Sequence, residues 1–581
     1  MKTLRNFPLY LLHTCFIVIL LTLSNCNEDK YLKEIPKDFY SPEIAYVTYS
    51  DFDAAVLNLH NLVRDNFIYQ NDNAVRTFLG LSGLTYPATD YAPDYAVVSI
   101  LLPTNTSIVY DRAWGPCYRI IYDANVIIGR ADSKESELTS EQKNKIKAEA
   151  LFFRAWAHKV LANLYGGVPI VLEETKEPKR DYVRASRTAV YEQCVADLKF
   201  AVDNLPDITE IVDVSRLSNL AASHLLSELY VTLGRWDEAI AAASFVIDNP
   251  ETSLMTERFG NKVEHPENLG FNKDPNFDGG DVYWDLFFLG NQSRASGNKE
   301  AILVMPQAYN VPGGGDGGPG VRCQVSRLWQ MEVKNSNGKA IKMIPDPNEN
   351  YGGRGGGFTR PSPYFSKTLW AKSGPGDIRN APHNIIRDWI VRNPASEHNG
   401  KWLIADNLPI DLVSFNDTMR NFFPVIAKGS TFGSFPDELL LEDQTVPGAI
   451  GATGPCKRNW KDQYVIRLAE TYLLRAEAYL GKGDKAMAAA DINVVRSRAQ
   501  AAPVAPGDVD IDYILDERMR ELSTETLYLC TTARLGKTAE RVRKYFPLLG
   551  RTYEDYHNLW PIPYGEIEKN VEAVLEQNPG Y

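Results

Sequence analysis

The stretch AETYLLRAEAYLGKGDKAMAAADINVVRSRA, residues 469–499, decides the fold of this chain. Apolar residues recur there at three- and four-residue steps on both sides of a glycine-containing turn, which predicts two amphipathic helices. Tyr479 in the first helix and Ala488 in the second lie nine residues apart. The stretch therefore predicts two helices that pack against each other as a pair.

A second copy of this pattern, AASHLLSELYVTLGRWDEAIAAASFVIDNP, occupies residues 221–250. Tyr230 and Ala239 have the same nine-residue spacing, and small residues after Ala239 let the helices approach closely. This pattern is typical of a tetratricopeptide helix pair. Because about 250 residues separate the two copies, we expect an interrupted array instead of a regular solenoid.

The remaining chain divides into helical blocks and one long interruption. Residues 141–165 and 188–206 have helical periodicity and end at glycine or proline. Residues 251–455 contain two glycine runs, GGGDGGPG and YGGRGGGF, and few periodic segments apart from a short strand expected at 301–307. Neither glycine run is followed by Lys-Ser/Thr, so we expect turns there and no phosphate-binding loop.

The N-terminus has the pattern of a secretory signal. Lys2 and Arg5 precede an apolar run that is too short and too near the start for a permanent membrane span. Residues 23–26, Leu-Ser-Asn-Cys, resemble a bacterial lipobox, so we expect a signal peptide over 1–25 and a lipid on Cys26. The alternative is an ordinary signal peptide that is cut nearby, with Cys26 incidental.

Composition excludes several classes of function. The net charge is −12 and no long basic tract occurs, so nucleic acid is not an expected partner. The seven cysteines are scattered and form no CxxC pair, which indicates neither a zinc site nor a dense disulfide framework. The 30 Tyr, 23 Phe and 10 Trp supply flat faces that suit sugar binding, although most must pack the core.

Several separated blocks resemble the SusD/RagB-like family of outer-membrane nutrient-binding lipoproteins. They are YRIIYDANVIIGRAD, AEALFFRAWAHKVLANLYGGVPIVLEE, DQYVIRLAETYLLRAEAYLGKGD, ILDERMRELSTE and the ending LWPIPYGEIEKNVEAVLEQNPGY. The blocks occur in order through the mature chain, and the resemblance is weakest across 251–455.

The resemblance implies an all-α-dominated fold in one domain, 26–581. Four tetratricopeptide-like helix pairs, over about 40–250 and 456–581, would frame an irregular ligand-binding region over about 251–455 that carries few short strands. It also implies a non-enzymatic role on the outer membrane: capturing oligosaccharide and passing it to a SusC-like TonB-dependent transporter. In related bacteria, acids after the lipidated cysteine favour the cell surface, and Glu28 and Asp29 fit that signal.

Charged residues interrupt the apolar pattern of the matched helices. Arg467, Glu470, Arg475 and Glu477 lie in one block, and Arg518-Met-Arg520-Glu521 in another. They could be acids and bases of a catalytic site, but ion pairs between helices are the interpretation we favour. At the end of the chain, Gln577-Asn578-Pro579 is expected to hold the tail by side-chain hydrogen bonds.

Sugar sites place aromatic faces and polar side chains together on loops. One candidate is LTYPATDYAPDY, residues 84–95, with Tyr86, Tyr91 and Tyr95 beside two aspartates. The alternative is an ordinary Pro/Tyr turn. A second candidate group lies in the variable region and consists of Tyr283, Trp284, Trp329 and Tyr364, with Arg322 and Gln324 as hydrogen-bonding partners. Each of these aromatic residues could equally belong to the core.

A calcium loop is a further candidate in DPNFDGGDVYWD, residues 274–285. Asp274, Asn276, Asp278 and Asp285 match ligand positions one, three, five and twelve, although the twelfth is normally a bidentate Glu. The alternative is an Asp/Asn/Gly turn that binds no ion. No other cofactor is expected.

Three other functions stay open on sequence alone: the same role with peptide cargo, a secreted glycoside hydrolase, and a scaffold built on the repeats. The chain has no GxSxG elbow and no HExxH metal helix. Among its 74 carboxylates, spacing alone does not reveal a catalytic pair.

Overall fold

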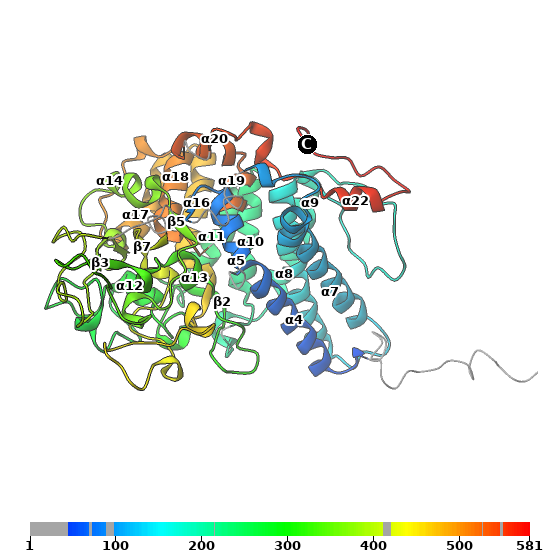
Figure 1. Cartoon of the computed structure of the whole chain (residues 1–581). Helices are drawn as coiled ribbons and strands as arrows, with labels where there is room; N and C mark the ends of the chain where they lie inside the picture. Colours follow the sequence, from blue (N-terminus) through cyan, green and yellow to red (C-terminus); the bar gives the residue numbers. More distant parts are fainter. Residues whose placement is uncertain are drawn as a thin grey trace, which may run out of the picture.

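The computed structural model describes residues 45–68, 72–88, 98–213, 215–410, 420–525, 527–546 and 550–581. The expected signal peptide, Cys26, Tyr91 and Tyr95 lie outside these ranges. Within them, no helix is long and apolar enough to cross a membrane. Long helices gather on one side of the molecule, and a loop-rich half drawn in green and yellow covers the other side (Figure 1).

The helical frame begins with α4 (Tyr49–Phe67), α5 (Asp72–Leu81), α6 (Thr106–Val109), α7 (Gly115–Ala131), α8 (Ser140–Tyr165), α9 (Arg187–Asn204), α10 (Asn219–Thr232) and α11 (Trp236–Ile247). It resumes with α16 (Leu468–Gly481), α17 (Lys485–Arg498), α18 (Ile511–Leu522), α19 (Tyr528–Arg534), α20 (Thr538–Tyr545) and α22 (Tyr564–Lys569). The insertion between them contains α12 (Val282–Phe287), α13 (Gly320–Gln324) and α14 (Leu369–Ala371).

Local signals explain where the predicted helices begin and end. The hydroxyl of Thr139 accepts from the backbone N–H of Gln142, whose side chain accepts from Thr139 N–H, so a capping box starts α8. Gly166, at φ 77°, ends it. Ser218 caps α10 and Asp484 caps α17 in the same way as Thr139 caps α8. The predicted helix pairs at 221–250 and 469–499 are confirmed.

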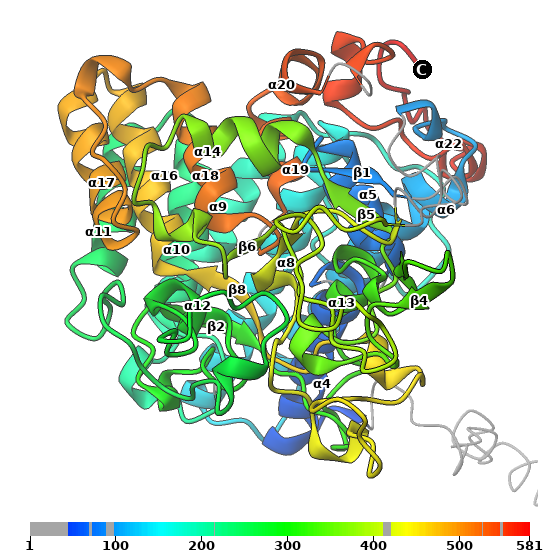
Figure 2. The same cartoon turned by 60° about the vertical axis from the view of Figure 1, so that its left-hand side comes forward.

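The two separated helix pairs join in space to form one continuous stack. α11 packs directly against α16, across the point where the insertion leaves the frame (Figure 2). The ring of Trp236 lies where a side chain at Gly481 would be, and Lys482 pairs with Asp237. The insertion therefore leaves the repeat array without breaking its packing.

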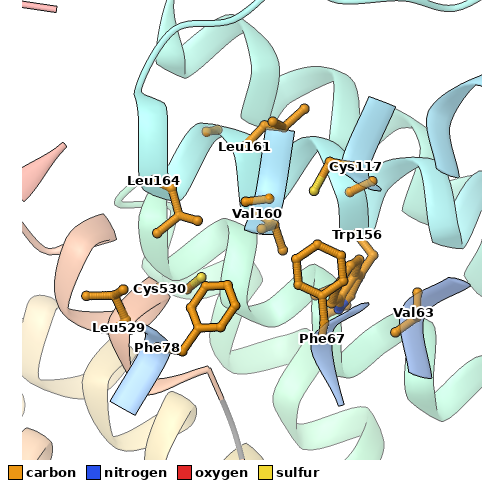
Figure 3. Packing of buried hydrophobic residues seen from close by; sticks show 14 of the residues in the cluster. Val63, Phe67, Phe78, Cys117, Trp156, Val160, Leu161, Leu164, Leu529 and Cys530 are labelled. Carbon is orange, nitrogen blue, oxygen red and sulfur yellow. The ribbon is translucent and has the colours of Figure 1, made fainter. Parts of the chain in front are cut away.

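Buried apolar side chains from helices distant in sequence form the main core. Figure 3 shows Phe67 of α4, Phe78 of α5 and Trp156 of α8 packed beside Cys117 and Cys530. The rings of Phe67 and Trp156 meet edge to face with centroids 4.8 Å apart. The five cysteines of the described residues are all buried and free, so no disulfide contributes there.

The strands are short, and all the pairs except the β3–β4 hairpin join segments that are far apart in the chain. They are β1 (Thr85–Pro87), β2 (Ala301–Met305), β3 (Glu332–Lys334), β4 (Ala340–Lys342), β5 (Thr359–Pro361), β6 (Ile385–Ile386), β7 (Val425–Ile426) and β8 (Gln463–Arg467). The antiparallel pairs are β1–β5, β2–β8, β3–β4 and β6–β7. The predicted strand at 301–307 is β2, and its partner β8 leads directly into α16.

Buried ion pairs connect helix α18 to the insertion and to the rest of the frame. Glu521 is fully buried and accepts from Arg467 at 2.7 Å, from Arg379 at 3.1 Å and from Arg498. Burial alone would raise the pKa of Glu521, but the three guanidinium groups lower it well below its ordinary value. Arg379 belongs to the insertion, so this carboxylate links the two halves.

Glu517, one helical turn earlier, forms a similar set of contacts. It accepts from Arg379 at 2.7 Å, Arg496 at 2.9 Å and Arg520 at 2.6 Å. Further pairs join α16 to its neighbours: Glu470 with Arg518, Arg475 with Asp491 and Glu477 with Arg534. The interpretation of these charges as ion pairs between helices is confirmed for Glu470, Arg475, Glu477 and Arg518. Arg520 pairs within its own helix, and Arg467 pairs from β8.

The C-terminal tail is held as expected. Gln577 Oε1 accepts from the N–H of Ile562 at 2.7 Å, and its amide donates to the Ile562 carbonyl. Asn578 Nδ2 donates to the carbonyl oxygens of Tyr165 and Trp560. These bonds fix the tail against the end of α8.

Glu521→Gln should lower the free energy of unfolding by about 3–5 kcal/mol, because it leaves buried guanidinium groups without their carboxylate. The matched control Glu540→Gln removes a carboxylate that is 48% exposed and pairs with Lys537, and should cost at most about 1 kcal/mol. Urea unfolding measures both changes. Equal, small effects would contradict a structural role for the buried network.

The free energy of unfolding should also fall as the pH decreases, because Glu517 becomes protonated. Burial raises its pKa, but Arg379, Arg520 and Arg496 outweigh this and lower it to about 2 from 4.5. Because the folded-state pKa is depressed, its contribution is present above the unfolded pKa and is lost as pH falls through the folded pKa. Thermal unfolding of wild type and Glu517→Gln should therefore differ less as pH decreases from 4.5 towards 2. A constant difference would refute the assignment.

Candidate functional site

The second glycine run forms an extended segment that exposes alternate residues. From 354 to 360, Arg354, Gly356, Phe358 and Arg360 are half-buried, whereas the residues between them are buried. Arg354, Phe358 and Arg360 are therefore the side chains of this segment that border solvent.

Glycine is needed in this segment because other backbone lies against it. A Cβ on Gly356 would overlap the carbonyl oxygen of Arg322, and one on Gly357 would overlap that of Arg420. Gly357 also has φ 60°, which favours glycine. The predicted turn is found at Gly352 and Gly353, with φ 81° and 88°. Gly356 and Gly357 instead allow a close approach that gathers three arginine-bearing segments.

Three guanidinium groups surround the ring of Phe358. Their central carbon atoms lie 4.3 Å (Arg76), 4.8 Å (Arg420) and 4.9 Å (Arg322) from the ring centroid. Arg76 comes from α5, Arg322 from α13 and Arg420 from the segment before β7. Cations gain from an aromatic face, so Phe358 holds together charges that would otherwise repel one another.

Trp329 carries two more cations. Its Nε1 donates to the carbonyl of Gly355 at 2.9 Å, which fixes the orientation of the half-buried ring. The guanidinium carbon of Arg354 lies 4.9 Å from the centroid and Lys342 Nζ lies 5.7 Å from it. The indole is therefore a fixed aromatic surface bordered by positive charge.

Tyr86 brings the N-terminal part of the chain to the same place. It lies in β1 opposite Arg360 of β5, whose guanidinium carbon is 5.8 Å from the tyrosine ring centroid. The strand pairing extends through the bond from Ala88 N–H to the carbonyl of Phe358 at 2.8 Å. Tyr86 is 8% exposed, so Arg360 is the more accessible member of the pair.

Among the residues that the structure describes, Asp72 is the carboxylate that pairs with the arginines named above, at 2.5 Å from Arg322. Asp72 also lies 3.4 Å from Arg458. Burial lowers the pKa of Arg360, and burial together with nearby Arg322 lowers that of Arg354. Both shifts indicate cations that lack a neighbouring acid. We call Arg76, Arg322, Arg354, Arg360 and Arg420 the arginine cluster.

The structure brings together part of the predicted binding set. Arg322 belongs to the arginine cluster, and Tyr86 and Trp329 border it, although the three come from two separate candidate groups. Gln324 lies on the same short helix as Arg322, but its side chain is buried beside Gly429. Tyr91 lies outside the described residues, as does Tyr95.

The prediction that Tyr283, Trp284 and Tyr364 present faces to a ligand is wrong. They are 4%, 5% and 5% exposed, respectively. Tyr283 donates to the carbonyl of Glu521 at 3.1 Å, and Tyr364 donates to Asp516 at 2.7 Å while stacking on another tyrosine. The loops of the insertion need a core of their own, and these aromatic residues supply part of it.

The predicted calcium loop is also wrong. In the described part of the chain, no three acidic, histidine or cysteine side chains are grouped so that they could hold a metal ion. Asp285 is fully buried and forms an ion pair with Arg258 at 2.5 Å. Arg258 also forms an ion pair with Asp278 at 3.0 Å. Asp274 and Asn276 form a turn instead, through the bond from Asn276 N–H to Asp274 Oδ1.

Sequence reasoning did not identify Arg354, Phe358 or Arg360. The run YGGRGGGFTR contains the signal: polar and aromatic residues at alternate positions among glycines. A hollow of 490 Å³ on the helical frame is lined by aromatic residues: Tyr110, Trp114, Tyr118, Tyr122 and Tyr182. It is an alternative location for a ligand.

Comparison with known proteins places the chain in a family. A model described as the SusD family matches residues 453–581, and one described as "Starch-binding associating with outer membrane" matches residues 88–231. The chain belongs to the SusD/RagB-like family. SusD-like protein P25 of Formosa agariphila is 23% identical over 97% of this chain and 98% of its own. A SusD-like protein of Bacteroides ovatus is 27% identical over 39% of this chain and 42% of its own.

Solved SusD-like structures have the same fold. A laminarin-binding SusD-like protein has a TM-score of 0.63 at 22% identity, with 92% of this chain and 100% of that chain covered. Surface glycan-binding protein A of Bacteroides thetaiotaomicron, in complex with laminarihexaose, has a TM-score of 0.61 at 17% identity and the same coverage. The predicted family and the helical, tetratricopeptide-like fold class are confirmed.

Gly356→Ala should destabilise this SusD-like chain by about 1–3 kcal/mol, because the added methyl group overlaps the backbone of Arg322. Gly507→Ala is the matched control: open space surrounds Gly507, so the change should stay within about 0.5 kcal/mol. Denaturant unfolding compares the two. If Gly356→Ala is as neutral as its control, the close approach described above is absent.

Proposed function

We propose that this SusD-like chain is a non-catalytic glycan-binding protein whose ligand lies on Trp329, Phe358 and the arginine cluster. The orientation of Trp329 carries the proposal, since its half-buried ring is fixed by a hydrogen bond and bordered by Arg354. Sugar C–H faces pack against aromatic rings, and guanidinium groups donate to sugar oxygens. The two solved relatives named for laminarin and laminarihexaose support the ligand class.

Tyr91 and Tyr95 remain part of the proposed set on sequence grounds. Ala88, a described residue that precedes both in the sequence, donates to the carbonyl of Phe358. Tyr86 contacts Arg360 of the arginine cluster. Together these residues would extend the contact beyond a single sugar unit.

The proposed cellular role follows from the family. The matched model described as associating with the outer membrane supports a location there, with a lipid on Cys26 as the anchor. The chain would hold its glycan near a SusC-like TonB-dependent transporter and release it inward. Loss of co-purification with such a transporter from detergent-extracted membranes would count against this role.

Catalysis is not part of the proposal. Glycoside hydrolysis needs two carboxyl groups on either side of the scissile bond. Asp72 is the acid that the described residues place at the arginine cluster, and it forms ion pairs with Arg322 and Arg458. Peptide cargo is the remaining alternative, because backbone carbonyl groups also accept from guanidinium groups.

Trp329→Ala should weaken glycan binding roughly tenfold or more, as expected when a central aromatic contact is lost. Tyr122→Ala is the matched control, because Tyr122 is 37% exposed and lines the hollow on the helical side. Isothermal titration of both variants against a panel of oligosaccharides and peptides measures the effect. A loss confined to Tyr122→Ala would move the site to the helical side, and binding of peptides alone would refute glycan cargo.

A further inference from the structure

We propose that the bound glycan is anionic, with sulfate or uronate carboxylate groups held by Arg354 and Arg360 beside the aromatic surface. This inference rests on the proposed glycan-binding function and specifies the chemical class of the ligand. Five guanidinium groups gather at one place in the described structure, whereas the whole chain has a net charge of −12.

The local charge runs against the charge of the chain. Arg76, Arg322 and Arg420 all lie within 4.9 Å of the centroid of one ring, so no two of their central carbon atoms can be farther apart than twice that distance. Charges this close repel one another, since they fall within the screening length of about 8–10 Å. Asp72 compensates part of this charge through Arg322 and Arg458.

Arg354 is the clearest anion-binding group. No carboxylate of the described residues lies within ion-pair distance of it, and its Nε is buried without a hydrogen-bond acceptor. Its neighbours are the indole of Trp329 and the cation Arg322. The positive charge of Arg322 favours an arriving anion over another cation. An anionic group beside a sugar stacked on Trp329 would accept from this guanidinium.

Arg360, which follows Phe358 in the sequence, has an environment similar to that of Arg354. Its Nε is likewise buried without an acceptor, and among the described side chains its charged group contacts the ring of Tyr86. Arg354 and Arg360 are both half-buried, and the half-buried Phe358 lies between them in the sequence. An acidic glycan that follows this segment would meet a guanidinium group at each end.

The energetics favour a charged ligand over a neutral one. Neutral hydroxyl groups can accept from arginine, but a carboxylate or sulfate adds the attraction of opposite charges to each hydrogen bond. Carboxylate and sulfate also match the planar fork of guanidinium with two parallel bonds. A neutral glycan would bring no opposite charge to Arg354 or Arg360, which have no carboxylate partner among the described residues.

The test uses two pairs of oligosaccharides, each with an acidic and a neutral member. Oligogalacturonides are compared with their methyl esters, and sulfated carrageenan oligosaccharides with the desulfated forms. An affinity difference in the first pair indicates carboxylate recognition, and one in the second pair indicates sulfate recognition. Titrations use the full chain and the variants Arg354→Gln and Arg360→Gln. The matched control is Lys485→Gln, which removes the same charge from an exposed position on α17.

In at least one pair, the acidic member should bind roughly tenfold more tightly than its neutral counterpart, and each arginine variant should remove a similar factor. Binding should weaken as salt rises, and Lys485→Gln should bind as wild type does. Equal affinity for the neutral and acidic members would overturn the inference and leave glycan binding intact. Failure of every glycan to bind would overturn the proposed function, and the inference with it.

Discussion

The architecture depends on the buried carboxylates of helix α18. Glu517 and Glu521 each face several guanidinium groups, and Arg379 of the insertion contacts both. Breaking one partner of a buried pair leaves an uncompensated charge, so the ions must remain together for the fold to persist. The insertion has only short strands among its described residues. The ion pairs of Arg379 with Glu517 and Glu521 therefore contribute to its position on the frame.

That positioning creates the candidate site. Arg76 comes from the frame, Arg322 and Arg354 from the insertion, and Arg420 from the approach to β7. Glycine at 356 and 357 lets these segments approach until their backbones touch. Trp329 and Tyr86 then lie against Arg354 and Arg360, and no carboxylate of the described residues pairs with either arginine, which leaves their charge available to a ligand.

The helical frame could be predicted from the sequence, but the arrangement of the candidate site could not. The spacing from Tyr479 to Ala488 and the charged positions of the matched blocks report local periodicity, so the helix pairs and their ion pairs could be predicted. The stacking of α11 on α16 depends on packing across the whole insertion. Sequence carries no local signal for such a contact.

Most of the incorrect predictions from the sequence concern aromatic residues. Tyr283 and Tyr364 lie in loop-rich sequence, as Trp329 does, but they pack the core of the insertion and donate to buried acceptors. Whether an aromatic side chain faces solvent depends on what covers it, and that is decided by distant segments. Arg354 and Phe358 were missed because glycines replace the side chains that would reveal an alternating pattern.

A structure of the protein with a bound oligosaccharide tests the account most directly. We expect a sugar ring against Trp329 or Phe358, with an acidic substituent within hydrogen-bond distance of the guanidinium of Arg354 or Arg360. An oligosaccharide bound in the hollow lined by Tyr110, Trp114 and Tyr182, with the arginine cluster empty, would contradict it.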